Sequence, residues 1–306
     1  MLAKRLTEGS RVGVVAPSSP VTRETQGQLE RGISFLQGLG LELVVGEHVF
    51  STTLGYCASP EEKAADINEM FADDTIEGIV CAQGGVTANA CLPHLSWPTI
   101  SANPKVFTGI SDITVLLNAI YAATGLVTFH GNDLLWGFGR NPTDYDHDAF
   151  VRTLMDGLPG SIEPNGERRT IRSGTCEGVA LGGNLRCLLK LAGTPYLPDP
   201  AGAIIFLEAI DVTSETCDCM VHQLEQMGVF EAVAGAVVGH VDGLQAEAGV
   251  TRLEEVLRAV TAPRDFPILK VDDFGHNCPN TVLPIGARVR LDADRQTIEQ
   301  IEPFIA

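Results

Sequence analysis

The chain has 306 residues, of which 44% are hydrophobic and 20% are charged, and it contains 32 glycines and 17 prolines. Such a composition is typical of a globular protein with many turns and excludes a disordered or fibrous one. The formal net charge is -18 at pH 7, and a surface of that sign disfavours nucleic acids and anionic membranes as partners.

Targeting and redox signals point to the cytoplasm. No apolar run reaches the roughly 18 residues that a membrane span needs, and no signal-like apolar core follows the charged N-terminus. The eight cysteines are scattered, several of them within apolar patterns, as expected for reduced thiols that pack as small hydrophobic side chains.

Up to about residue 160, short apolar runs alternate with amphipathic segments, which predicts βαβ units around a parallel sheet. The sequence Ser59-Pro60-Glu61-Glu62 combines a capping box with a proline at the first helical position, and Gly40 follows the end of another predicted helix. We predict strands at 11–16, 41–45, 77–82, 105–109 and 126–129, and helices at 22–39, 59–72, 113–123 and 144–155.

The pattern breaks between residues 157 and 166, where closely spaced glycines and prolines predict a linker. Beyond it, short β runs dominate. We predict strands at 169–172, 178–181, 203–207, 236–241, 268–271, 287–291 and 297–301, and helices at 184–191, 214–227 and 252–261. The chain is therefore predicted to form an α/β domain over 1–160 and a β-rich mixed domain over 161–306.

One junction in the first domain has the residues of a nucleophile turn. The run 105–109 ends at Gly109, Ser111 follows two residues later, and a helical pattern begins at Ile113. A tight strand-to-helix turn exposes a serine hydroxyl, and N–H groups at the helix start can hold an oxyanion. The match to G-x-S-x-G is partial, because Ile113 replaces the second glycine. The alternative is that Ser111 only caps the helix.

Two further polar residues lie at or just beyond the ends of predicted strands. Glu208 closes the apolar run 203–207, and His276 follows the run 268–271. In α/β folds, groups at the carboxyl ends of strands line the ligand crevice. A serine, a glutamate and a histidine in such places predict a hydrolytic triad, in which His276 takes the Ser111 proton and Glu208 orients the imidazole. The alternatives are a strand end that meets water and a structural loop histidine.

Other chemistry has weaker support. Gly84-Gly85 resembles half of a phosphate-binding loop, but the chain has neither a G-x-G-x-x-G motif nor a Walker lysine. Cys217 and Cys219 fall on a predicted helix and point about 200° apart, so they do not converge on one metal ion. Cys278 lacks an oxyanion turn of its own and is interpreted as a bystander.

Four residues are candidates for substrate binding. Trp136 lies in a predicted loop, where its ring could stack on a ligand, although tryptophan more often serves packing. Arg140, Arg186 and Lys190 are the cations available for a substrate carboxylate, and the alternative for each is a solvated surface charge.

Several segments, taken together and in order, resemble the LD-carboxypeptidase family of serine peptidases, which includes the microcin-C immunity peptidases. The segments are RVGVVAPS at 11–18, GG at 84–85, GISDIT at 109–114, FHG at 129–131, GGNL at 182–185, FLE at 206–208, and DFGH at 273–276 with LPIG at 283–286. They run from residue 11 to residue 286, so the resemblance covers nearly the whole chain.

The resemblance implies a flavodoxin-like N-terminal domain, with helices on both faces of a parallel sheet, that supplies Ser111. It implies a β-rich C-terminal domain that supplies Glu208 and His276, and an oxyanion hole made by the backbone N–H groups of Gly85 and Asp112. It also implies a cytoplasmic, usually homodimeric peptidase without metal or cofactor. Such an enzyme acts in peptidoglycan recycling and cleaves terminal D-alanine from the L-centre of diaminopimelate.

The chain departs from the murein-type pattern beside the glycine pair. Gln83-Gly84-Gly85-Val86-Thr87 stands where many of those members have Arg-Gly-Gly-Tyr-Gly, so Gln83 becomes a further candidate for substrate binding. Asn89 and Leu92-Pro93 are closer to the microcin-immunity branch. We therefore hold three hypotheses: a carboxypeptidase with a small peptide substrate, murein tetrapeptide; an amidase that cleaves peptidyl or aminoacyl nucleotides; and a non-catalytic binding protein on the same scaffold.

Overall fold

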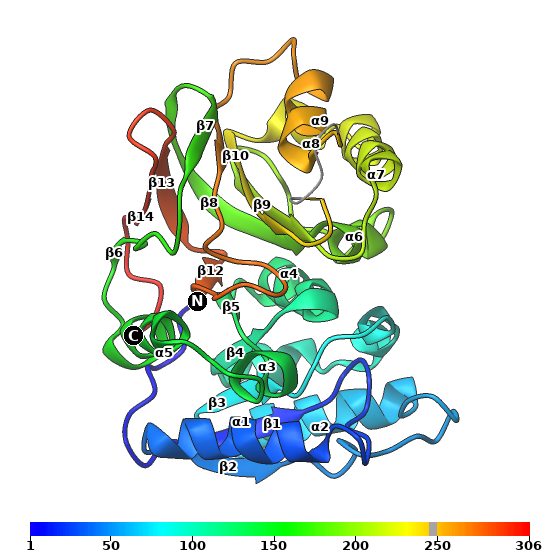
Figure 1. The fold of residues 1–306 in the computed structure, drawn as a ribbon. Coiled ribbons are helices and arrows are strands. Elements are labelled where there is room, and N and C mark those ends of the chain that lie inside the picture. Colours follow the sequence, from blue (N-terminus) through cyan, green and yellow to red (C-terminus); the bar gives the residue numbers. More distant parts are fainter. Residues whose placement is uncertain (245–249) are drawn as a thin grey trace.

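The structure is a computed structural model that describes residues 1–244 and 250–306. Its first half is built on a six-stranded sheet in the order β12-β5-β4-β3-β1-β2 (Figure 1). Five of the strands run parallel, and they are β1 (Arg11–Val15), β2 (Glu42–Val45), β3 (Gly78–Cys81), β4 (Val106–Gly109) and β5 (Thr128–His130). The sixth, β12 (Leu283–Ile285), comes from the far end of the chain and pairs antiparallel with β5.

The second half contains an eight-stranded mixed sheet in the order β6-β14-β13-β8-β9-β10-β11-β7. Its parallel centre is made of β8 (Thr175–Asn184), β9 (Ile204–Ala209), β10 (Gly235–Val241) and β11 (Ile268–Lys270). Its antiparallel flanks are β6 (Gly160–Ser161), β7 (Arg169–Arg172), β13 (Arg288–Asp292) and β14 (Thr297–Gln300).

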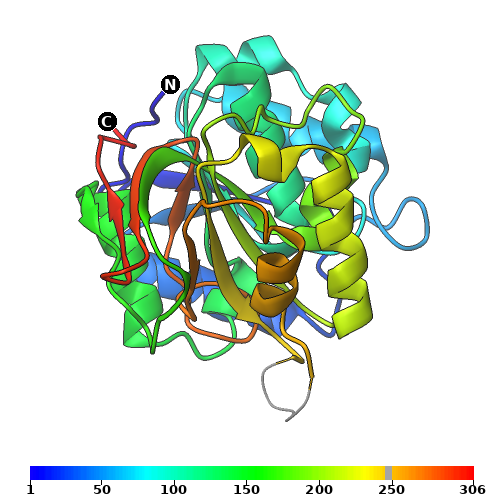
Figure 2. The ribbon, with the colours of Figure 1, turned by 90° about the horizontal axis from the view of Figure 1, so that it is seen from above.

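Helices pack against this second sheet as well. Figure 2 shows α7 (Ser214–Gln226) and α9 (Leu253–Val260) side by side next to the strands. The short segments α6 (Leu185–Leu188), η5 (Leu189–Leu191) and α8 (Val229–Ala232) complete this half.

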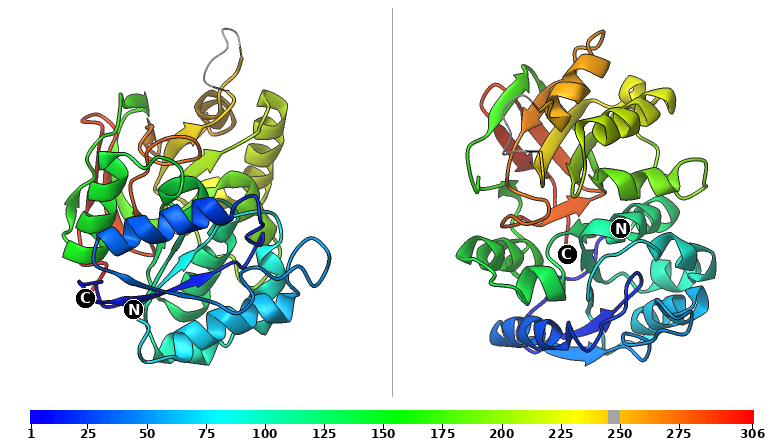
Figure 3. Two further views of the ribbon diagram at one scale, coloured as in Figure 1. Left: turned by 60° about the horizontal axis from the view of Figure 1, so that its bottom comes forward. Right: turned by 45° about the vertical axis from the view of Figure 1, so that its right-hand side comes forward.

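The first sheet is covered by helices on both faces, with α1 (Gln26–Gly38) on one side and α2 (Pro60–Ala72) on the other (Figure 3). Helix α2 has the predicted capping box between Ser59 and Glu62. The remaining helical segments are η1 (Ala88–His94), α3 (Trp97–Ala102), η2 (Ser111–Ile113), α4 (Thr114–Thr124), η3 (Leu134–Phe138), α5 (Asp144–Phe150) and η4 (Val151–Asp156).

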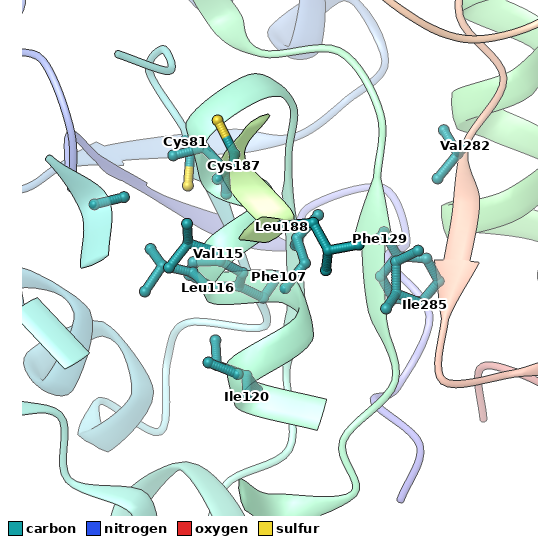
Figure 4. Packing of buried hydrophobic residues seen from close by; sticks show 14 of the residues in the cluster. Cys81, Phe107, Val115, Leu116, Ile120, Phe129, Cys187, Leu188, Val282 and Ile285 are labelled. Carbon is teal, nitrogen blue, oxygen red and sulfur yellow. The ribbon is translucent and has the colours of Figure 1, made fainter. Parts of the chain in front are cut away.

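The hydrophobic core is continuous between the two halves. One cluster of buried side chains includes Val115 and Leu116 of α4 together with Leu188 of the second half and Ile285 of β12. Figure 4 shows this packing around Phe129 of β5. The junction between the halves is therefore a packed apolar interface, which can hold polar groups at its edge in fixed positions.

The expected fold class is confirmed: an α/β half with helices on both faces of a parallel sheet precedes a β-rich mixed half. The division near residue 160 stays a prediction, and β12 crosses it, because this strand follows the predicted linker but belongs to the first sheet. No helix among residues 1–244 and 250–306 is long and apolar enough to cross a membrane.

Candidate active site

The predicted nucleophile turn follows β4 directly. Ile110 is extended and Ser111 has a φ of 65°. A positive φ is rare for a residue with a Cβ and costs on the order of 1–3 kcal/mol, so neighbouring contacts must hold it. The N-cap residues of η2 and α4 are Ile110 and Ile113, and neither helix start has a side-chain cap. The backbone therefore favours a nucleophile turn over a capping role for Ser111.

The segment Gln83-Gly84-Gly85 passes close beside this turn. A Cβ on Gly84 would lie 2.5 Å from Ser111 Cβ and 3.2 Å from the backbone nitrogen of Asp112. Gly85 has a φ of 146°, and a Cβ there would lie 2.2 Å from Ser19 Oγ. Only glycines permit so close an approach. The two segments that carry the predicted oxyanion donors, Gly85 and Asp112, therefore lie next to each other.

Glu208 and His276, which both belong to the second half, are hydrogen-bonded to each other. Glu208 lies in β9 and is completely buried, while His276 belongs to the loop after β11. The Nδ1 atom of His276 lies 2.7 Å from Glu208 Oε2, a hydrogen bond in which the imidazole N–H donates to the carboxylate. This contact leaves Nε2 of His276 as the nitrogen available to a substrate or nucleophile.

Charge explains the ionisation of this pair. Burial favours the neutral imidazole, but the negative charge of Glu208 and the hydrogen bond outweigh it and raise the pKa of His276. Burial likewise favours a neutral Glu208, but the charge of His276 and the hydrogen bond outweigh burial, so the pKa of Glu208 falls below its ordinary value. The pair is poised to stabilise an imidazolium that forms when His276 accepts a proton.

Ser111 and His276 line the same cavity at the junction of the two halves, and Glu208 lies behind His276. The cavity has a volume of about 860 Å³, which is large enough for a short peptide or a nucleotide. Gln83, Gly85, Trp136 and Arg140 also line it.

Three of these side chains form one connected wall. Gln83 Nε2 donates to the carbonyl of Pro20 at 2.7 Å, and Gln83 Oε1 accepts from Trp136 Nε1 at 3.0 Å. The guanidinium of Arg140 lies 6.0 Å from the centroid of the Trp136 ring. The hydrogen bond to Gln83 fixes the polar edge of the indole, and Trp136 is 48% exposed, so much of its surface remains open to a ligand.

Trp136, the centre of this wall, lies in η3, a π-helical turn that the sequence did not predict. The carboxylate of Asp133 caps this turn, accepting from the backbone nitrogens of Trp136 at 2.7 Å and Gly137 at 3.0 Å. Burial raises the pKa of Asp133 to about 6, although these hydrogen bonds oppose the rise.

Two of the cations predicted to bind a substrate carboxylate, Arg186 and Lys190, are not among the residues that line the cavity. Arg186 is exposed, donates to the carbonyl of Asp211 at 3.2 Å, and is not among the residues that line the cavity. Lys190 binds Asp112 and the carbonyl of Val86. Cys278 does line the cavity, but burial raises the pKa of its thiol above the usual range and so keeps it protonated.

Sequence reasoning missed the polar contacts that hold the histidine loop. Asp146 Oδ1 accepts from Asn132 Nδ2 at 2.6 Å and from the backbone nitrogen of Asn280 at 2.8 Å. Asn280 Oδ1 in turn accepts from the Gly275 nitrogen at 2.8 Å. Asn132, Asp146 and Asn280 belong to none of the motifs quoted above, and their contacts form only when the chain folds, so a single sequence has no signal for them.

Two family models match the chain. The model described as the LD-carboxypeptidase N-terminal domain matches residues 12–131, and the model described as the LD-carboxypeptidase C-terminal domain matches residues 177–291. Together they cover more than half of the chain and include Ser111, Glu208 and His276.

Relatives match this chain over more than nine tenths of their length. The chain is 30% identical to the microcin C7 self-immunity protein MccF of Escherichia coli, over 100% of this chain and 97% of that protein. It is 32% identical to a probable murein peptide carboxypeptidase of Bacillus subtilis, over 96% of this chain and 92% of that protein. The solved structure of MccF in complex with glutamyl sulfamoyl guanosine superposes with a TM-score of 0.92 at 29% identity, covering 100% of this chain and 99% of that one.

Proposed function

The chain belongs to the LD-carboxypeptidase family, and from this premise we propose that it is a serine carboxypeptidase that releases terminal D-alanine from murein tetrapeptide. The observation that carries the proposal is the shared cavity. Ser111 and His276 line it from the two halves of the molecule, and His276 is bound through Nδ1 to the buried carboxylate of Glu208.

The proposed reaction has two steps. Ser111 Oγ attacks the amide carbonyl while His276 Nε2 takes the hydroxyl proton, and backbone N–H groups of Gly85 and Asp112 hold the oxyanion. The C–N bond breaks, His276 gives the proton to the leaving amine, and D-alanine departs from an acyl-enzyme. Water, deprotonated by His276, then attacks the ester carbonyl. The C–O bond to Ser111 breaks, His276 returns the proton to Ser111 Oγ, and the shortened peptide is released.

A second candidate is a detoxifying amidase that cleaves a peptidyl or aminoacyl nucleotide, as the resemblance to the microcin-immunity branch suggests. Gln83 favours it, because this residue forms the cavity wall with Trp136 where murein-type members have an arginine. The wall then offers the flat ring of Trp136, held in place by Gln83, with Arg140 as the cation stacked on the ring.

One experiment tests the first proposal directly. Purified protein and its Ser111→Ala variant are incubated with L-Ala-γ-D-Glu-diaminopimelate-D-Ala, and the products are read by mass spectrometry. We expect D-alanine from the parent and a loss of turnover by a factor on the order of 10⁴–10⁶ in the variant. Equal release by a folded Ser111→Ala protein would exclude the triad assignment.

The same assay separates the two substrates. An aminoacyl-sulfamoyl-adenylate is offered in parallel with the tetrapeptide, and kcat/KM is compared. If only the adenylate is cleaved, and only by the parent, the amidase replaces the carboxypeptidase as the function. If neither is cleaved and a serine-directed phosphonylating reagent leaves Ser111 unlabelled, the third hypothesis, a binding protein, takes their place.

We also propose that the protein acts in the cytoplasm as a homodimer in peptidoglycan recycling, as membership of the family suggests. Cell fractionation tests the compartment, and light scattering coupled to size-exclusion chromatography tests the dimer. A mass of about 65 kDa is expected, since one chain has a mass of 32.6 kDa, and a monomeric mass at micromolar concentration would contradict the proposal.

A further inference from the structure

Lys190 reaches from the second half of the molecule into the first. It lies in η5, directly after β8 and α6. Its ammonium donates to Asp112 Oδ1 and, at 2.8 Å, to the carbonyl oxygen of Val86. The side chain of Lys190 is 19% exposed and that of Asp112 is fully buried. The proposed oxyanion donors are the backbone N–H groups of Gly85, which precedes Val86, and of Asp112. The ammonium of Lys190 therefore binds both segments that carry these donors.

The carboxylate of Asp112 has further partners on the opposite side. Asp112 Oδ2 accepts from Ser18 Oγ at 2.6 Å and from the backbone nitrogen of Ala88 at 2.8 Å. Ser18 Oγ also accepts from the backbone nitrogen of Thr87 at 3.2 Å. The backbone directly after Gly85 is thus held by the side chains of Ser18, Lys190 and Asp112, and the first two of these also bind the Asp112 carboxylate.

We propose that Lys190 is a positioning residue that clamps the two oxyanion-donor segments against each other, an inference that rests on the serine-peptidase function proposed above. Ser111 directly precedes Asp112 in the second of these segments and has a strained backbone conformation, with a φ of 65°. Strain of this kind persists only where surrounding contacts fix it. The Asp112 carboxylate, with its donors from Lys190, Ser18 and Ala88, supplies such contacts one residue away from Ser111.

The clamp has a direct consequence for rate. Oxyanion donors act only when they are aimed at the position that the oxyanion will occupy, and a small misplacement removes most of their effect. Substrate binding depends on other groups, because Lys190 is not among the residues that line the cavity. Loss of the clamp should therefore lower kcat much more than it changes KM, whereas loss of a substrate-binding cation would raise KM.

Lys190→Met is the first test, because methionine keeps much of the aliphatic stem and removes the ammonium. Lys4→Met is the matched control, since Lys4 is exposed and forms no ion pair among the described residues. D-alanine release from the tetrapeptide gives kcat and KM, and a fluorophosphonate gives a rate constant for labelling of Ser111 that needs no knowledge of the natural substrate. Thermal unfolding of each variant is measured in parallel.

We expect Lys190→Met to lower kcat by about 10- to 100-fold, with KM within about threefold of the parent value, and to slow phosphonylation by a similar factor. Lys190→Arg keeps the cation and should recover part of the loss. Ser18→Ala loosens the same carboxylate from the first half and should lower kcat by a smaller factor. It is the deciding variant if Lys190→Met does not fold.

The results separate the inference from the function on which it rests. Parental kcat and labelling rate in folded Lys190→Met, or a raised KM with unchanged kcat, would overturn the clamp. If the parent is phosphonylated but releases no D-alanine, the tetrapeptide proposal fails and the labelling rates still decide the role of Lys190. If the parent is not phosphonylated at Ser111 at all, the serine-peptidase function and the clamp both fail.

Discussion

The contact between His276 and Glu208 defines the chemistry of the site at the scale of single residues. A carboxylate with no exposure to solvent is expensive to bury unless a partner compensates it, and the 2.7 Å hydrogen bond to His276 supplies that compensation. The same bond fixes the proton on Nδ1 and so leaves Nε2 free to act as a base.

Glu208→Gln tests this arrangement. A glutamine amide keeps the shape but lacks the charge, and its N–H can hold the wrong tautomer of His276, so we expect kcat to fall by about 10³- to 10⁴-fold. The acidic limb of kcat/KM reports the pKa of His276, because a protonated imidazole cannot accept the serine proton. Glu208 raises that pKa, so the limb should move to lower pH in the variant.

The measurement is a profile of kcat/KM from pH 5 to pH 9 for the parent, Glu208→Gln and Glu30→Gln. Glu30 is exposed on α1 and serves as the control for loss of one negative charge. An acidic limb that stays in place in Glu208→Gln, together with parental kcat, would remove Glu208 from the mechanism.

At the scale of elements, η3 depends on one buried carboxylate. Asp133 caps this turn, and burial raises its pKa from the ordinary 3.8 to about 6. Between those two values the folded state keeps a proton that the unfolded chain has lost. Stability contributed by this group is therefore present at low pH and declines as pH rises to about 6.

Asp133→Asn should remove this decline. The amide oxygen can still accept from Trp136 and Gly137, but the side chain no longer ionises. We expect the unfolding free energy of the variant relative to the parent to rise by about 2 kcal/mol between pH 4.5 and pH 7.5. Urea unfolding at both pH values measures this double difference, in which the titrations of groups that do not interact with Asp133 cancel. A difference independent of pH would contradict the argument.

Elements with strong local signals were predictable from sequence. The capping box of Ser59 and the apolar run 203–207 predicted α2 and β9 to within two residues at each boundary. The turn η3 was missed because Leu134–Phe138 is short and its cap becomes effective only once Asp133 is buried. Strand β12 was missed because it is three residues long with a proline at its centre, and its partner β5 is more than 150 residues away.

The same limit applies to the site. Ser111, Glu208 and His276 could be proposed because each follows a predicted strand, a position that carries meaning in α/β folds. Lys190 was proposed as a substrate cation because a sequence shows a charge without its partner, and the partner is Asp112, 78 positions earlier. Pairings of this kind depend on how the two halves pack, which no local pattern encodes.

At the scale of the whole molecule, the two halves depend on each other. Strand β12 completes the first sheet, and the last residues return to the start of the chain, where Ala306 N donates to the Ala3 carbonyl at 2.8 Å and Arg5 N donates to the Ala306 carbonyl at 3.0 Å. The two termini lie close together in Figure 1. The cavity draws its lining from both halves, so the proposed triad exists only when both are folded and packed.

A fragment of residues 1–160 tests this dependence. It keeps the five parallel strands but loses β12, so the edge of β5 at Thr128–His130 is left unpaired, and Phe129 loses its packing against Phe304. Unpaired edges and exposed apolar side chains favour aggregation over folding. We expect the fragment to lack a cooperative thermal transition and to bind a hydrophobic dye, whereas the full chain unfolds cooperatively. A soluble fragment with a sharp transition and dispersed amide NMR signals would show instead that the first half is an autonomous domain, and that β12 only docks onto a sheet already formed.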